Sequence, residues 1–124
     1  MSAAGGIGNV ELIAAIEAVA ANDNQVTRQA LFHILRESRL VLALEGEELV
    51  LAVGDDEEVY VPAFTDVAAM RTAFPDTYDP RVETAQVVFQ LVLAGECAGL
   101  AINPAGPIGG ILPRADVATL VESP

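Results

Sequence analysis

Three short apolar runs in the middle of the chain constrain its fold more than any other feature. The runs cover residues 40–44, 49–53 and 59–63. Acidic, glycine-containing segments at 45–48 and 54–57 separate them, and such segments are typical of turns between strands. The spacing therefore predicts an antiparallel meander of three strands.

Alternation along these predicted strands makes both faces of the meander apolar. One face carries Leu40, Leu42, Leu44, Leu49, Leu51 and Val53. The opposite face carries Val41, Ala43, Val50, Ala52 and Tyr60. Antiparallel sheets commonly leave one face polar, so the second apolar face needs a cover. That cover is a helix of the same chain, a second copy or another protein. Burial within the chain is the ordinary expectation, and this second face is the candidate partner surface.

Two helices are predicted ahead of the meander. The first is capped by Asn9, ends at Asn22-Asp23-Asn24, and has apolar residues at helical spacing. These residues are Leu12, Ile13, Ile16, Val19 and Ala20. The second helix is amphipathic. Its apolar side carries Leu31, Ile34, Leu35 and Ser38, and its solvated side carries Gln29, His33, Arg36 and Glu37.

The segment Phe64-Thr65-Asp66 predicts the start of another helix, over residues 66–74. Thr65 is suited to cap this helix, Phe64 precedes the cap, and Pro75 ends the helix. Asp79-Pro80 repeats the pattern of a cap followed by proline, which predicts a helix ending at Gly95. The interval is rich in Val and Phe, so a strand there stays an alternative.

Two further strands are predicted at residues 97–102 and 107–112. They are joined by Asn103-Pro104-Ala105-Gly106, in which Asn, Pro and Gly occupy positions that a type I turn favours. Pro113 then opens a final helix. The order of elements predicts one α+β domain over residues 9–124, after a flexible N-terminus at 1–8. Its antiparallel sheet has about five strands, from the meander and the later hairpin, with helices packed on it.

Several of these segments together resemble the SseB protein N-terminal domain, a bacterial family named for a serine-sensitivity phenotype. The resemblance extends from about the second predicted helix onward. It is carried by the run from Val61 to Asp66, the helix after it, the strand ending at Asn103, and the final helix. The motif residues are Phe64, Thr65, Asn103, Pro104 and Gly106. The resemblance implies an α+β domain without an agreed biochemical activity or catalytic residue set, so it implies no functional residues.

The charge of the chain disfavours two classes of partner. The chain has eighteen Asp and Glu residues and six arginines, which gives a net charge of −12. Such a field repels phosphate backbones and anionic lipid, so we expect neither nucleic-acid nor membrane binding. Gln86 and Gln90 interrupt the longest apolar stretch. No basic residue precedes the first apolar stretch and Cys97 is the only cysteine, so we expect no signal peptide and a cytoplasmic location.

Residues that carry enzyme chemistry are few. Neither Cys97 nor His33 has a neighbour in sequence that suggests an orienting acid, and Cys97 is interpreted as a buried apolar residue. The acidic runs at 45–48 and 55–58 lack the spacing of a calcium loop and are interpreted as solvated turns. The run Gly106-Pro107-Ile108-Gly109-Gly110 is followed by no Lys or Ser/Thr, which favours a hairpin over a phosphate loop. We expect no cofactor, no metal and no catalytic residue.

These observations favour a non-catalytic, cytoplasmic protein-interaction module that binds another protein or a second copy of itself. Size and charge leave a small acidic chaperone for a secreted or basic client as an alternative. A second alternative is a ligand-binding or enzymatic domain with a pocket between Asn103 and Gly110.

Overall fold

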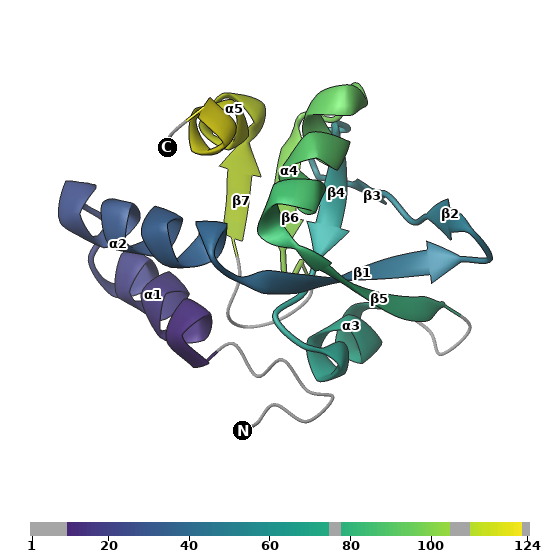
Figure 1. Ribbon diagram of the computed structural model, residues 1–124, viewed down its shortest axis with the longest axis horizontal. Helices are drawn as coiled ribbons and strands as arrows, with labels where there is room; N and C mark the ends of the chain where they lie inside the picture. Colours follow the sequence, from purple (N-terminus) through teal and green to yellow (C-terminus); the bar gives the residue numbers. More distant parts are fainter. Residues whose placement is uncertain (1–9, 75–77, 105–109, 123–124) are drawn as a thin grey trace.

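The protein has an α+β fold, as the order of its predicted elements indicated (Figure 1). The computed structural model describes residues 10–74, 78–104 and 110–122. The helices are α1 (Val10–Ala21), α2 (Gln25–Arg36), α3 (Val67–Ala73), α4 (Ala85–Ala94) and α5 (Arg114–Glu122). The strands are β1 (Arg39–Glu45), β2 (Glu48–Leu49), β3 (Ala52–Val53), β4 (Val59–Ala63), β5 (Asp79–Thr84), β6 (Gly99–Ile102) and β7 (Gly110–Pro113). Within these described ranges, no helix combines the length and the apolar character needed to span a bilayer.

The strands of the described residues form two sheets. One has the order β2-β1-β5 and the other has the order β3-β4-β6-β7. Neighbouring strands are antiparallel, except that β4 and β6 run parallel. In Figure 1, β1 and β5 run across the direction of β4, β6 and β7. The sheets meet where Val41 and Phe64 exchange two backbone hydrogen bonds, each with an N···O distance of 2.8 Å.

The predicted meander has its two antiparallel turns, but it is not one sheet. β2 pairs with β1, whereas β3 pairs with β4 and places Ala52 opposite Tyr60. The predicted middle strand, 49–53, is divided between the two sheets at Val50 and Leu51. The backbone N–H of Val50 still donates to the carbonyl of Ala43 on β1, at 2.9 Å. The chain therefore passes from one sheet to the other within a single apolar run.

The helix predicted from residue 79 to residue 95 is wrong in its first part. Residues Asp79–Thr84 form β5, which pairs with β1 from Arg39 opposite Thr84 to Leu44 opposite Asp79. The strand alternative is therefore correct here, because β1 needs a neighbour to satisfy its backbone groups. Pro80 is tolerated because β5 lies at the edge of its sheet. The connection between parallel β4 and β6 thus contains a strand of the other sheet.

The second part of that prediction is correct, because α4 forms and ends at Gly95 as its C-cap. Thr84 caps α4 by accepting from the N–H of Val87 at 3.4 Å. The cap predicted for α3 is displaced by one residue. Asp66, and not Thr65, accepts from the N–H of Ala69 at 2.7 Å. An aspartate at this position also complements the positive end of the helix dipole.

Two apolar cores hold these elements together, and β1 contributes to both. The larger core lies among α1, α2, α4, α5 and the facing sides of the strands, and includes Leu40 and Leu42 of β1. The smaller core contains Val41, Ala43, Phe64 and Met70, with α3 over it. Both faces of β1 are apolar, as expected, and both are covered by the chain itself.

The five residues of the candidate partner surface do not form one surface. Val41 and Ala43 are fully buried, and Val50 packs against the same small core under α3. Ala52 and Tyr60 lie in the other sheet. These positions are therefore not available as a single partner surface, because α3 covers three of them and the other two lie in the other sheet. The strand pattern alone did not indicate where the predicted helix at 66–74 would pack.

Candidate functional site

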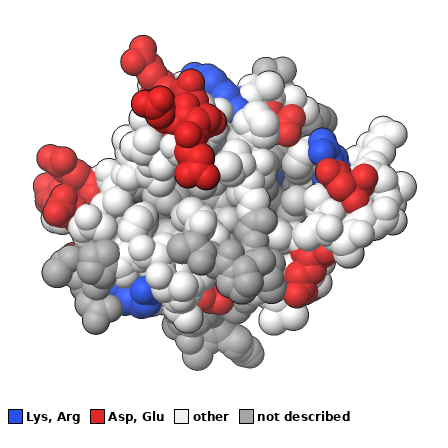
Figure 2. All heavy atoms as spheres, turned by 180° about the vertical axis from the view of Figure 1, so that it is seen from behind, with Lys and Arg blue, Asp and Glu red and all other residues white. Residues whose placement is uncertain are grey.

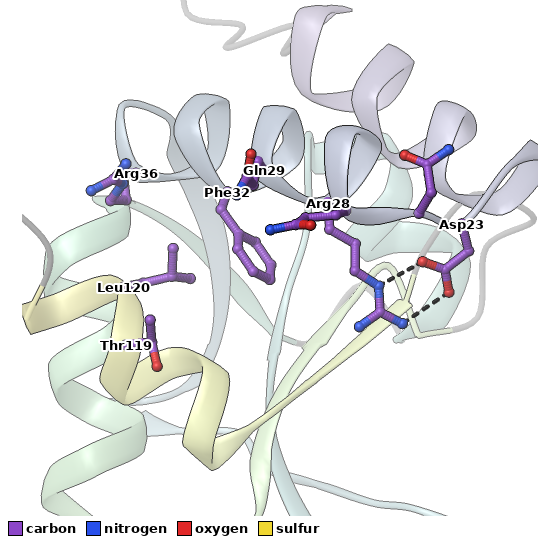
Figure 3. Close-up of a pocket in the computed structure, with 9 residues that line it drawn as sticks. Asp23, Arg28, Gln29, Phe32, Arg36, Thr119 and Leu120 are labelled. Atoms are coloured by element: carbon purple, nitrogen blue, oxygen red, sulfur yellow. Dashed lines mark hydrogen bonds and ion pairs between the residues drawn. The ribbon is translucent and has the colours of Figure 1, made fainter.

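A groove between α2 and α5 is the candidate functional site (Figure 3). Its volume is about 850 Å³, which is within the range of ligand pockets. The described residues that line it are Asp23, Asn24, Gln25, Arg28, Gln29, Phe32, Arg36, Thr119 and Leu120. Helix α2 packs on α1, and α5 packs on α4 and on the β6–β7 pair, and both helices contribute side chains to the larger core.

The floor of the groove is apolar. Phe32 is half-buried and points from α2 into the space between the helices, toward the side of α5 that carries Leu120 (Figure 3). Leu120 itself is buried in the larger core. Gln29 and Thr119 are exposed and add polar groups beside this floor. Phe32 and Leu120 thus form an apolar floor, and the other seven lining residues are polar or charged.

Two arginines of α2 lie at opposite ends of this floor. Arg28, Phe32 and Arg36 are spaced four residues apart, which places them along one stripe of the helix. Figure 3 shows Arg28 at the end nearer Asp23 and Arg36 at the other end, beyond Phe32. Eight residues of α-helix rise by about 12 Å, so two guanidinium groups flank a floor about two turns long.

Arg28 is positioned by the residues that start α2. Its Nε and Nη2 donate to the two carboxylate oxygens of Asp23, at 2.5 Å and 2.9 Å. The helix begins with a capping box in which Asn24 accepts from the N–H of Thr27, and Thr27 accepts from the N–H of Asn24, both at 3.0 Å. The start of α2 is thus held in the geometry that brings Asp23 to Arg28.

The ion pair fixes the charge of both partners. Hydrogen bonds from Arg28 hold the pKa of Asp23 below its ordinary value. The same contact raises the pKa of Arg28, to which the carboxylate of Asp116 on α5 adds a smaller contribution. Both groups therefore stay charged at neutral pH, and the pair is half exposed to solvent.

Cys97 and His33 lie in different surroundings in the described structure. Cys97 is buried in the larger core, which confirms its interpretation as an apolar residue. His33 lies on the exposed side of α2, and its Nε2 is 3.7 Å from a carboxylate oxygen of Glu37. The described polar groups of the groove are guanidinium, amide, hydroxyl and carboxylate groups, which suit hydrogen bonding and charge pairing.

The acidic turns are exposed and separate. Glu45, Glu47 and Glu48 lie at the β1–β2 turn, and the residues of 55–58 lie at the β3–β4 turn. Seen from behind the view of Figure 1, acidic side chains form separate groups toward the edges of the molecule (Figure 2). Among the described residues, no three His, Cys, Asp or Glu side chains gather as metal ligands.

A second hollow, of about 440 Å³, lies where the sequence suggested a pocket beside the β6–β7 hairpin. Its described lining is mainly apolar and includes Ala52, Tyr60, Asn103, Pro104 and Ile111. Strands β6 and β7 are antiparallel, as predicted for this hairpin. Residues 105–109, with Gly106 and most of the glycine-rich run, lie outside the described residues, and so do Asn9 and the N-terminal segment 1–8.

Three described motif residues of the family resemblance, Phe64, Thr65 and Asn103, are brought together at a structural clamp. The N–H of Thr65 donates to Asn103 Oδ1 at 3.0 Å, and Asn103 Nδ2 donates to Thr65 Oγ1 at 3.1 Å. The backbone N–H of Asn103 donates to Ala63 at 2.9 Å, so the side chain extends the β4–β6 ladder beyond its last pair. Asn103 has a φ of +50°, a conformation that asparagine tolerates better than most residues. Phe64 is fully buried beside the clamp and packs edge-on against Phe74.

The groove itself was not predicted. The sequence pattern predicts Arg36 on the solvated side of its helix and indicates no role for Arg28 or Phe32. The spacing of these three residues by four was a usable signal, because it puts one aromatic ring between two cations on one stripe. The wall formed by Thr119 and Leu120 comes from a helix that is distant in sequence, and no local pattern reports it.

Comparison with the curated proteins and with the solved structures gave no match. The family model of the SseB protein N-terminal domain matches residues 12–119. The matched region includes all of α2, the Thr65–Asn103 clamp and most of α5. The match covers most of the chain, and the protein therefore belongs to the SseB protein N-terminal domain family.

Proposed function

We propose that this domain is a non-catalytic binding module, and that it holds a short segment of a partner protein in the groove between α2 and α5. The observation that carries the proposal is the half-buried ring of Phe32 between Arg28 and Arg36. Aromatic and arginine side chains are the residue types that contribute most to protein interfaces.

The shape of the groove favours a segment over a large flat partner. The floor is about two helical turns long, and an extended peptide or a short helix fills such a space with one apolar anchor. A contact of this size is smaller than a stable interface between globular proteins, so we expect a weak, reversible complex. This proposal replaces the partner surface inferred from the strand pattern.

The chemistry of the groove also favours binding over catalysis. Its described polar side chains donate or accept hydrogen bonds, and its one described carboxylate, Asp23, is held by Arg28. The sulfhydryl of Cys97 lies in the larger core and not in the groove. A binding role requires only the arrangement already present, whereas a reaction would require an activated nucleophile or base.

The test is selection of ligands from a displayed library of random dodecapeptides on the immobilised domain. Enriched peptides are then measured by fluorescence polarisation against the protein and two variants. Gln29→Glu places a carboxylate in the groove at an exposed position, and Gln90→Glu makes the same charge change on the exposed side of α4. We expect Gln29→Glu to weaken binding and Gln90→Glu to leave it unchanged.

Two results would overturn the proposal. One is a selection that enriches no peptide. The other is a set of peptides that bind wild type and Gln29→Glu equally, which would place their site elsewhere. Circular dichroism of each variant checks that the fold is kept, and neither exposed substitution is expected to alter stability by more than about 0.5 kcal/mol.

A further inference from the structure

We infer that two copies of this domain associate by antiparallel pairing of their β5 strands, about a twofold axis at Val82. The pairing joins the two β2-β1-β5 sheets into one sheet of six strands, three from each copy. It uses a surface separate from the α2–α5 groove, because no described residue that lines the groove belongs to β5. The inference therefore goes beyond the proposed function and does not depend on it.

Strand β5 presents a free edge. In the part of the chain that the structure describes, its sheet has the order β2-β1-β5, so β5 has a neighbouring strand on one side only. The two faces of the β1–β5 pair are occupied, with α4 over one and α3 over the other (Figure 1). Five of the six residues of β5 are exposed. An edge of this kind is a template for pairing with another strand.

The contacts of β1 determine which backbone groups of β5 reach this edge. Val41 exchanges its two hydrogen bonds with Phe64, so its N–H and C=O point away from β5. These directions alternate along a strand, so Leu42 faces β5 and bonds with Arg81, which lies opposite it. Val82 lies opposite Val41. Its N–H and C=O therefore point outward, to the free edge.

Pro80 and Thr84 lie two residues before and after Val82, so their backbone groups also point outward. Pro80 has no N–H to offer. Thr84 is the N-cap of α4, so its C=O already accepts the first hydrogen bond of that helix. The edge thus offers the N–H and C=O of Val82, the C=O of Pro80 and the N–H of Thr84.

One register pairs all of these groups. When Val82 lies opposite Val82 of a second copy, the two residues exchange their N–H···O bonds. Pro80 then lies opposite Thr84 of the second copy, and the N–H of that Thr84 donates to the C=O of Pro80. A proline at an edge normally prevents pairing. In this register, however, its missing N–H meets a carbonyl that is already used within α4.

The charges of β5 favour the same register. Arg81 and Glu83 lie on one face, on either side of Val82, and form an ion pair within the chain. With the axis at Val82, Arg81 lies opposite Glu83 of the second copy, in a pair whose side chains are close. Each guanidinium group then lies between two carboxylates. An axis at Arg81 or at Glu83 would instead place like charges opposite each other, which is destabilising.

The dimer should be weak. Each copy carries a net charge of −12, so long-range repulsion opposes association. This repulsion is screened beyond about 8 Å at physiological salt. The contact consists of one strand edge and the side chain of Val82, which is 41% exposed, so it is smaller than most stable interfaces. We therefore expect a dimer that is populated only at high protein concentration.

The experiment is sedimentation velocity at about 0.15 M salt, with protein from about 10 μM to about 1 mM. Wild type is compared with Arg81→Glu, Glu83→Arg and a control, Glu17→Arg, at an exposed position of α1. Arg81→Glu and Glu83→Arg each put like charges opposite each other at two places in the dimer. We expect each to raise the dimer Kd about tenfold, and Glu17→Arg to leave it unchanged.

Mixing Arg81→Glu with Glu83→Arg separates pairing between chains from the ion pair within one chain. One variant has carboxylates at both positions and the other has guanidinium groups at both, so neither forms its own ion pair. Across the axis at Val82 the two strands are nevertheless complementary. We expect the mixture to form a dimer with a Kd close to that of wild type.

Amide exchange followed by NMR tests the same register in wild type, without any substitution. The N–H of Val82 should exchange more slowly as the protein concentration rises, because it is bonded only in the dimer. The N–H of Arg81, which faces β1, should change much less. The inference is overturned if wild type stays monomeric up to about 1 mM. It is also overturned if Arg81→Glu or Glu83→Arg dimerises as tightly as wild type, if their mixture stays monomeric, or if exchange at Val82 is independent of concentration.

Discussion

Replacing Asn103 by glycine should destabilise the domain strongly, although the residue lies outside any regular element. Asn103 and Thr65 are 6% and 1% exposed, so their two hydrogen bonds lie in a dry site. Removing the acceptor of a buried N–H costs about 1–3 kcal/mol, and the lost bond to the Thr65 hydroxyl costs about 1 kcal/mol more. The expected loss is about 2–4 kcal/mol.

The assay is thermal unfolding followed by circular dichroism. For 124 residues, the unfolding entropy corresponds to about 0.26 kcal/mol per degree, so Asn103→Gly should lower Tm by about 8–15 °C. Asn103→Ala should lose about 0.5–1 kcal/mol more stability than Asn103→Gly, because alanine is strained at a φ of +50° and glycine is not. The matched control, Asn22→Gly at an exposed asparagine, should shift Tm by less than about 2 °C. A Tm for Asn103→Gly within that margin of wild type would refute the clamp.

Three further outcomes follow from other contacts. Arg114 donates to the carbonyls that end α4 and precede β6 at 2.7–3.1 Å, so Arg114→Lys should cost about 1–3 kcal/mol in denaturant unfolding; an unchanged midpoint would contradict this. Phe64→Ala should cost about 3–5 kcal/mol, measured the same way, because it empties the centre of the smaller core. Tyr60 donates to Asp56 and lowers its pKa below the ordinary 3.8, so this stabilisation is present above pH 4 and is lost as pH falls through the folded-state pKa. The Tm difference between wild type and Tyr60→Phe should therefore shrink from pH 5 to pH 2, and a constant difference would count against the contact.

Local sequence patterns predicted the helices and strands better than they predicted which strands pair with each other. The apolar spacing located α1, α2 and the outer strands β1 and β4. Gly95 marked the end of α4, and Pro113 marked the start of α5. The segment from Asp79 was assigned to a helix because Asp-Pro is a good helix start. It became β5 because β1 lacked a neighbour, and that requirement is visible only in three dimensions.

Side-chain roles were missed for the same reason. Thr65 is a residue type that favours helix caps, but its hydroxyl and N–H are hydrogen-bonded to Asn103, a residue 38 positions away. Asp66 therefore takes the cap. The second apolar face of the meander was recognised correctly, yet its cover, α3, was identified only when the fold placed it there. The groove is formed by α2 and α5 together, so the spacing of residues within one helix can predict one wall of the groove at most.

The two sheets are interleaved along the chain. One is built from segments between residues 39 and 84, and the other from segments between residues 52 and 113, with the break at Val50 and Leu51 joining them. No single cut of the backbone leaves either sheet whole without part of the other. The pairing of β1 with β5 closes a long loop, and such non-local contacts slow folding. The domain should consequently fold slowly, in one cooperative step. Amide exchange at Val41 and Phe64, where the sheets meet, should occur only through global unfolding.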